Sequence, residues 1–237
     1  MSAFEHLQGA AMAAHVTKQK VAGPVPCDFC DLQKVCRALE LEGNRLPSGR
    51  MRLVEKGGTV YRAGDRVDYL YTAHRGMLKS VTRDANRTRL VSVHVPGEAI
   101  GVSAIETRTL AADIVAVTPT IYCSLPLSAL TPENYARVPQ LAAAVSQLQT
   151  AEPARRTTPV SGTLSERVRA FFTNLSQRLA QRGMDSEGLE FDVPREELGQ
   201  HFRRNIDALE GAIEDAARCG VIQLRNNKIT LRRHAPS

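Results

Sequence analysis

The stretch from Met51 to about Leu127 constrains the fold of this chain more than any other feature. Short apolar runs alternate there with turn signals, which centre on the glycines of Gly57-Gly58, Gly64-Asp65, Arg75-Gly76 and Gly97-Glu98. Many short strands at this spacing are typical of an antiparallel barrel or jelly roll. We therefore predict an α+β protein with a β-roll (jelly roll) in this region and helices elsewhere.

The composition of the 237 residues is that of a globular chain with one or two domains. No apolar run approaches the roughly 18 residues that a membrane helix needs. The formal net charge of +6 is compatible with a polyanionic partner but is too small to identify one. The start of the chain lacks a basic segment before its mildly apolar stretch, so we expect no secretory signal, no membrane and a cytoplasmic location.

Four of the five cysteines show a pattern that suggests metal binding. Cys27, Cys30 and Cys36 are spaced as Cys-x2-Cys-x5-Cys, and Cys123 lies far downstream in a predicted strand. Thiolates are soft ligands that suit an iron–sulfur cluster or a tetrahedral zinc ion. A metal held by all four would tie the N-terminal arm to the predicted roll. Cys219 has no partner motif, and we interpret it as a small buried residue.

Helical patterns follow the predicted roll. Residues 132–152 have a helical period that places Leu141, Val145 and Leu148 on one face, where they are candidates for a dimer interface. Pro153 is expected to end this helix, and Pro159 continues a linker.

A second helical region forms the last part of the chain. A helix is predicted to open at Thr163, with Glu166 completing a capping box. The runs PREELGQHF and IDALEGAIEDAARCG then form a helix–turn–helix candidate, in which Asn205 can cap the second helix. The run VIQLRNNKITL indicates a hairpin around Asn226-Asn227. A helix–turn–helix followed by a hairpin is the winged-helix arrangement.

No motif supports an enzymatic activity. The six histidines lack the spacing of a zinc protease, and the chain has no glycine-rich P-loop. No nucleophile with its base can be argued from the sequence. We therefore expect a protein that is not an enzyme.

Over about residues 27–233 the chain resembles the FNR branch of the CRP/FNR transcription regulators. The cysteine pattern is the most specific part, and the segments GGTVYRAGD, YLYTAHRGMLKS, HVPGEAIG and RVRAFFTNLSQRLAQRG match in position and type. The resemblance implies a cyclic-nucleotide-binding-type β-roll, a long dimer helix and a C-terminal winged helix. It also implies a 4Fe–4S cluster on Cys27, Cys30, Cys36 and Cys123, with zinc as the alternative. In FNR-like proteins oxygen converts the cluster to 2Fe–2S, the dimer separates and DNA is released.

The resemblance and the residue patterns divide the chain into four parts. These are a flexible arm (1–26), the cysteine cluster and sensor roll (27–130), a dimer helix and linker (131–162), and a winged helix–turn–helix domain (163–237). We expect a cytoplasmic regulator whose dimerisation and DNA binding depend on the cluster. Its expected partners are double-stranded DNA and a second copy of the chain, with RNA polymerase left open. The alternatives are a cluster sensor that acts through a protein partner and a zinc-stabilised protein without sensing.

The second helix of the helix–turn–helix departs from the family pattern. The family usually shows Glu-x-x-Ser-Arg where this chain has Asp207, Glu210 and Gly211. Gly211 cannot replace an arginine that contacts guanine, a contact worth roughly 1–3 kcal/mol. The turn places Arg203 where the family has glycine, which is strained if that position needs a positive φ. The predicted DNA contacts lie in the helix–turn–helix and the hairpin: Arg195, Arg203, Arg204, Asn205, Asp207, Glu210, Arg225 and Lys228.

A cyclic nucleotide is not expected in the roll. Binders of this fold use a glutamate soon after a loop glycine for the ribose and an Arg-Ser or Arg-Thr pair for the phosphate. Here Val102 follows Gly101, and residues 110–112 are Leu-Ala-Ala where the pair should fall. We therefore interpret Gly97 and Gly101 as turn residues.

Overall fold

The computed structural model describes residues 22–41, 51–84, 87–155 and 161–233. The predicted flexible arm therefore lies mostly outside the described residues. Its last part is packed against the strand Tyr69–Arg75 (β3). The Val25 amide donates to the His74 carbonyl at 2.8 Å, and the Gly76 amide donates to the Ala22 carbonyl at 3.2 Å. Residues 22–26 are thus an ordered edge of the roll.

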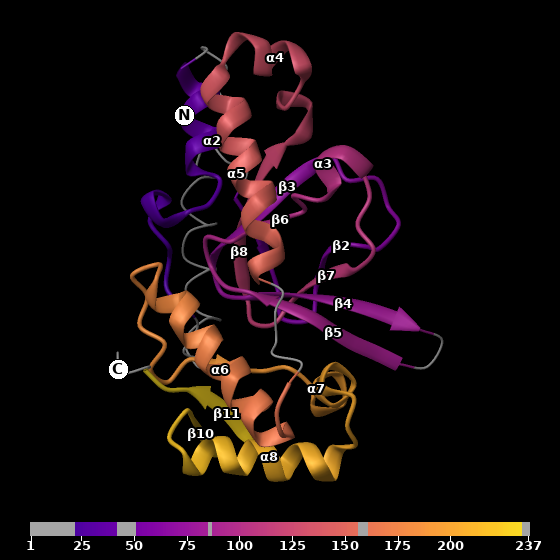
Figure 1. Cartoon of the computed structure of the whole chain (residues 1–237), viewed down its shortest axis with the longest axis vertical. Coiled ribbons are helices and arrows are strands. Elements are labelled where there is room, and N and C mark those ends of the chain that lie inside the picture. Colours follow the sequence, from indigo (N-terminus) through magenta and orange to yellow (C-terminus); the bar gives the residue numbers. More distant parts are fainter. Residues whose placement is uncertain (1–21, 42–50, 85–86, 156–160, 234–237) are drawn as a thin grey trace, which may run out of the picture.

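The β-roll consists of two four-stranded antiparallel sheets, which confirms the predicted jelly roll (Figure 1). The first sheet has, in spatial order, β1 (Arg52–Val54), β8 (Thr120–Pro126), β3 and β6 (Ala99–Ile100). The second has β2 (Thr59–Tyr61), β7 (Asp113–Ala116), β4 (Leu78–Asp84) and β5 (Arg87–His94). All the predicted turn glycines except Gly58 have positive φ angles, including Gly97 (86°) and Gly101 (92°), a conformation that glycine adopts without steric cost.

Strand β7 is buried on both of its faces. Ile114 and Ala116 belong to the apolar core inside the roll. Val115 and Val117 point the other way and belong to a second core, which continues into the C-terminal domain. Alternate side chains of a strand lie on opposite faces, so a nearly continuous apolar run is what a strand covered on both faces requires.

The helices between the two domains differ from the prediction of one helix over 132–152. The structure has two helices, α4 (Pro132–Arg137) and α5 (Pro139–Arg155), which are separated at Val138. A proline at the first position of α5 is favourable, because the amide it lacks would have no partner inside the helix. Pro153 does not end α5, which continues for two residues beyond it. A proline this close to a helix end removes one hydrogen bond from the last turn.

The predicted dimer residues lie in the core of a single chain. Leu141, Val145 and Leu148 are at most 5% exposed and pack in the core of the roll. Helix α2 (Gln33–Leu41) covers α5 and contributes Val35 and Leu39 to the same core. The period of the apolar face was predicted correctly, but its partner is this chain, so a dimer contact through these three side chains is not supported.

The remaining roll elements are short helices. They are η1 (Cys27–Phe29), α3 (Ala104–Thr107) and η2 (Leu127–Ala129). None of the helices in the described part of the chain is long and apolar enough to cross a membrane.

The C-terminal domain has the predicted winged-helix order. It comprises α6 (Leu164–Ala180), β9 (Glu190–Phe191), α7 (Arg195–Phe202), α8 (Ile206–Arg218), β10 (Ile222–Arg225) and β11 (Lys228–Leu231). The capping box of Thr163 and Glu166 is confirmed. The hairpin is also confirmed, since β10 pairs with β11 and both Asn226 and Asn227 have positive φ angles, as a type I′ turn requires.

Candidate metal centre and nucleic-acid interface

Two of the predicted metal ligands meet at one position of the roll. Thr72 on β3 is paired in register with Cys123 on β8. The thiol of Cys30 donates to the Thr72 hydroxyl oxygen at 3.9 Å. Cys30 follows η1 near the start of the described chain, whereas Cys123 lies on the last strand of the roll. The fold therefore brings together two cysteines that are far apart in the sequence. We call residues 27–36, which hold three of the cysteines, the cysteine segment.

Electrostatics place a third thiol in the same neighbourhood. Burial raises the pKa of Cys30, and the charges of Asp31 and Cys27 raise it further. Burial likewise raises the pKa of Cys123, with the charges of Cys30 and Cys27 adding to the effect. Thiols with raised pKa values stay protonated at neutral pH, and a metal ion would have to displace their protons to bind.

The fourth predicted ligand lies elsewhere on the segment. Cys36 is on α2, where it packs against the apolar core of the roll. Within the described ranges, no group of three or more His, Cys, Asp or Glu side chains is arranged to hold a metal ion. The donor set of four thiols fits a soft metal centre.

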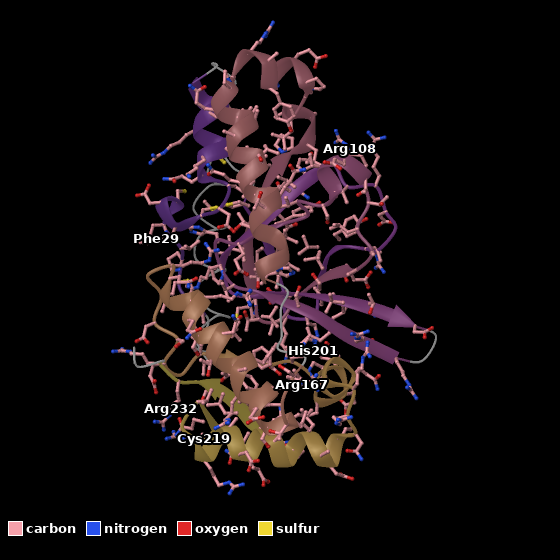
Figure 2. The ribbon with its side chains drawn as sticks, in the orientation of Figure 1. Phe29, Arg108, Arg167, His201, Cys219 and Arg232 are labelled. Carbon is pink, nitrogen blue, oxygen red and sulfur yellow. The ribbon has the colours of Figure 1, made fainter. Side chains whose placement is uncertain are left out.

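Cys219 corrects one expectation from the sequence. It is exposed at the end of α8 and not buried, and Arg169 Nη1 donates to its sulfur at 3.7 Å. Figure 2 shows Cys219 in the C-terminal domain, far from Phe29 in the cysteine segment. A helix end leaves this side chain at the surface, which its residue type alone did not indicate.

The roll contains a cavity of about 390 Å³. His94 is the one titratable side chain among the described residues that line it, and its Nε2 lies 2.6 Å from the Ser80 hydroxyl and 3.1 Å from the Ser92 hydroxyl. These lining residues supply no arginine or lysine. A cyclic phosphate would therefore meet no fixed positive charge there.

The helix–turn–helix is built by local signals that the sequence carries. The Asn205 side chain accepts a hydrogen bond from the Ala208 amide at 3.0 Å, which confirms the predicted cap of α8. Arg203 ends α7 with a φ of 54°, the left-handed conformation in which a non-glycine residue is strained. The conditional prediction of strain at this turn is thereby confirmed.

The solvent-facing side of α8 carries both acidic and basic residues, and a glycine without a side chain lies in its middle. Its exposed residues are Ile206, Asp207, Ala208, Gly211, Glu214 and Arg218. A Cβ atom added at Gly211 would meet no atom within 4 Å. The two acids on this face do not favour phosphates.

The predicted cationic contacts divide into two groups. Arg203, Arg204 and Arg225 are exposed, and Lys228 is also exposed at 3.8 Å from the Glu190 carboxylate. Arg195 is instead mostly buried and paired with Glu210 on α8. The structure thus leaves the turn and the hairpin open to phosphates and uses Arg195 inside the domain.

Reasoning from sequence missed four charged residues that join the domains. Arg178 on α6 and Arg182 in the turn after it bind Glu98 and Asp31 on the roll side. The sequence indicates for Glu98 only a place beside a turn glycine. The sequence signal for these contacts was the spacing of the two arginines by one helical turn. This spacing alone does not show which residues the arginines contact.

Comparisons with known proteins agree with this architecture. The family model described as the cyclic nucleotide-binding domain matches residues 51–132. The chain is 23% identical over 217 residues to the fumarate nitrate reduction regulatory protein of Klebsiella oxytoca, covering 87% of this chain and 86% of that one. It is 24% identical to the transcriptional activator protein anr of Pseudomonas aeruginosa, covering 91% and 92%.

A solved structure shows the same fold. FixK2 from Bradyrhizobium japonicum superposes with a TM-score of 0.64 at 17% identity, covering 80% of this chain and 99% of that one.

Proposed function

We propose that the chain is a DNA-binding transcription regulator of the CRP/FNR family and that an oxygen- or redox-sensitive 4Fe–4S cluster controls its binding to DNA. The proposed ligands are Cys27, Cys30, Cys36 and Cys123. The proposed setting is the cytoplasm, with the protein acting as a homodimer.

One observation carries this proposal. Cys30 and Cys123 are far apart in the sequence, yet both lie beside Thr72, and Cys27 is close enough to influence the pKa of each. Unrelated thiols would have no reason to gather at one position of the roll, on the two inner strands of a sheet. Four thiols also match the ligand chemistry of iron–sulfur clusters.

The residues of this chain would each have a defined part. Strand β8 would fix Cys123, and the cysteine segment would bring the other three thiols to it. A cluster bound there would supply a centre that reacts with oxygen or another oxidant. In a dimer, two copies of α8 would lie on half-sites one helical turn of DNA apart. The contact between the copies would use surface other than Leu141, Val145 and Leu148, because these are buried within each chain.

An anaerobic selection of genomic DNA fragments would test the proposal. Protein purified or reconstituted without oxygen would first be assayed for iron, sulfide and zinc, and would then select fragments before and after exposure to air. We expect the protein to contain iron bound by the four thiols. We also expect it to enrich one DNA sequence, and we expect exposure to air to abolish that enrichment. Zinc at one ion per chain, with no effect of air, would contradict the cluster.

Two cysteine variants make this experiment specific. Cys123→Ser removes a proposed ligand and should abolish both iron loading and the enrichment. Cys219→Ser is the matched control, because it replaces an exposed thiol in the other domain and should leave both unchanged. Equal loss in the two variants would indicate general damage to the protein.

A second candidate function is favoured by the exposed face of α8. Asp207, Gly211 and Glu214 present two acids and no side chain that could read guanine. A cluster sensor with weak DNA binding could use this face on a protein partner. Failure of visibly loaded protein to enrich any DNA, in either condition, would support this function over the first.

A further inference from the structure

Arg178 on α6 binds the roll through a buried carboxylate. Its Nε donates to Glu98 Oε1 at 2.8 Å, and its Nη2 donates to the Val93 carbonyl at 2.6 Å. Glu98 is 2% exposed, and its Oε2 also accepts from the Val95 amide at 3.0 Å. The carboxylate is therefore held in place from the roll side and presented to α6.

Arg182, in the turn that follows α6, binds the cysteine segment itself. Its Nη1 donates to the Phe29 carbonyl at 2.7 Å. Its Nη2 lies 3.1 Å and 3.2 Å from the two carboxylate oxygens of Asp31. The Arg182 and Asp31 side chains are 13% and 15% exposed, so water screens this pair far less than a surface pair. Phe29 and Asp31 are the two neighbours of Cys30.

Asp31 also fastens the cysteine segment to the roll. Its amide donates to the Gly97 carbonyl at 2.8 Å, and its Oδ2 accepts from the Ala99 amide at 2.9 Å. Gly97 leaves room for this approach, since a Cβ atom there would lie 2.8 Å from the Phe29 carbonyl oxygen. One carboxylate thus joins the cysteine segment, residues 97–99 and the turn that follows α6.

The Phe29 side chain adds a further contact between the cysteine segment and the C-terminal domain. Two atoms of its ring would lie 3.6 Å from a Cβ atom on Gly183, in the turn that follows α6. Figure 2 shows Phe29 on the side of the molecule where the roll meets α6. The cysteine segment therefore contacts Arg182 and Gly183, two residues of the turn that follows α6.

We infer that the cysteine segment is a strap that orients the DNA-binding domain within one chain, with Asp31 and the Phe29 carbonyl acting on Arg182. A displacement of Cys30 would move the Phe29 carbonyl and the Asp31 carboxylate, which Arg182 binds in addition to its contact with Glu98. The state of the cysteines would thus reach α6 without passing through a second chain. The inference rests on the proposed function only for what displaces the segment, because the contacts that carry it are those of Arg182 with Asp31 and Phe29.

Hydrogen exchange of the metal-free, full-length chain tests the strap in both directions. Asp31→Asn changes the cysteine segment, and we expect about tenfold faster amide exchange at residues 177–184 of the DNA-binding domain. Arg182→Gln changes that domain, and we expect a similar increase at residues 27–31 and at Ala99. Reciprocal effects are required if the two sites are coupled.

A matched control and a double variant complete the design. Arg233→Gln breaks an exposed pair with Asp185 inside the C-terminal domain and should leave residues 27–31 unchanged. The Asp31→Asn, Arg182→Gln double variant should exchange no faster than the faster single variant, because both remove the same contact. Additive effects, or effects confined to the domain that carries the substitution, would overturn the inference.

A second arm separates the strap from the proposed function. Exchange at residues 177–184 would be compared in the wild-type chain before and after anaerobic loading with iron and sulfide. We expect loading to change exchange there, and to change it less in Arg182→Gln. A chain that takes up no cluster would refute the proposed function while the metal-free arm still decides the strap. A loaded chain with no change at 177–184 would overturn the strap alone.

Discussion

Arg195 donates its Nε hydrogen to the Glu210 carboxylate over 2.7 Å and so joins the first residue of α7 to the middle of α8. Its Nη2 also donates to the Asn227 carbonyl at 3.0 Å, at the tip of the hairpin. One side chain therefore fixes both helices and the wing of the domain. The glutamate that departs from the family pattern has its charge matched within the chain.

Glu210→Gln should increase the affinity for DNA, because it removes a negative charge from α8 and releases Arg195. If the released arginine meets a phosphate, the plot of log affinity against log salt should steepen by about one unit. Fluorescence anisotropy titrations at several salt concentrations measure both. Glu214→Gln removes the same charge elsewhere on α8, so an equal steepening in that variant would rule out a role for Arg195.

Gly211→Arg should improve discrimination between DNA sites. The site has room for a side chain, and an arginine that contacts guanine is worth roughly 1–3 kcal/mol. Gly211→Ala is the control, since it should stabilise the exposed helix by about 1 kcal/mol without changing site preference. Competition binding between selected and scrambled DNA would show the difference. Equal site preference in the two variants would count against an arginine reading bases from this position.

Arg203→Gly should stabilise the folded chain by about 0.5–1 kcal/mol, because relief of the left-handed strain outweighs the added freedom of the unfolded chain. The same change should weaken DNA binding by removing an exposed cation. Urea unfolding and DNA titration measure the two effects. Arg204→Gly removes a neighbouring cation from a position with no positive φ, and it should weaken DNA binding without any gain in stability.

Acid should weaken the contact between α7 and β5 through His201. Burial lowers the pKa of His201, and the positive charges of Arg89 and Arg167 lower it further, although the hydrogen bond from Nδ1 to the Leu90 carbonyl at 2.9 Å raises it. The unfolded chain therefore binds a proton more readily than the folded chain, so stability falls as pH drops below about 6.5. Figure 2 shows His201 and Arg167 in the C-terminal domain beneath the β4–β5 hairpin.

His201→Gln tests this pH dependence, because glutamine keeps a donor for Leu90 and cannot titrate. The free energy of unfolding, measured by urea between pH 7 and pH 5, should fall less steeply in the variant than in the wild type. Parallel curves would mean that other groups cause the dependence.

Features encoded by neighbouring residues could be predicted from the sequence. The cap of α8 by Asn205, the box of Thr163 and Glu166, and the turn at Asn226-Asn227 each depend on a few adjacent residues and are all present. Such signals act before any tertiary contact forms, which is why one sequence suffices to find them.

Features that depend on which partner a helix or side chain contacts in the folded chain could not be predicted from the sequence. The apolar period of α5 was visible, but its burial beneath α2 in the same chain was not. The contact of Arg182 with Asp31 joins residues 151 positions apart, and neither residue carries a motif. Pairing of charges across two domains is set by how the domains dock, which residue spacing does not reveal.

Strand β7, with one face in each core, also bears on how the chain unfolds. The DNA-binding domain cannot leave the roll without exposing Val115 and Val117, and the roll cannot lose β7 without disturbing both cores. The two domains therefore do not behave as independent units joined by a linker, because both pack on β7. Heating should unfold them in one cooperative transition. Any process that separates the two domains must supply the free energy needed to expose the surface that they bury against each other.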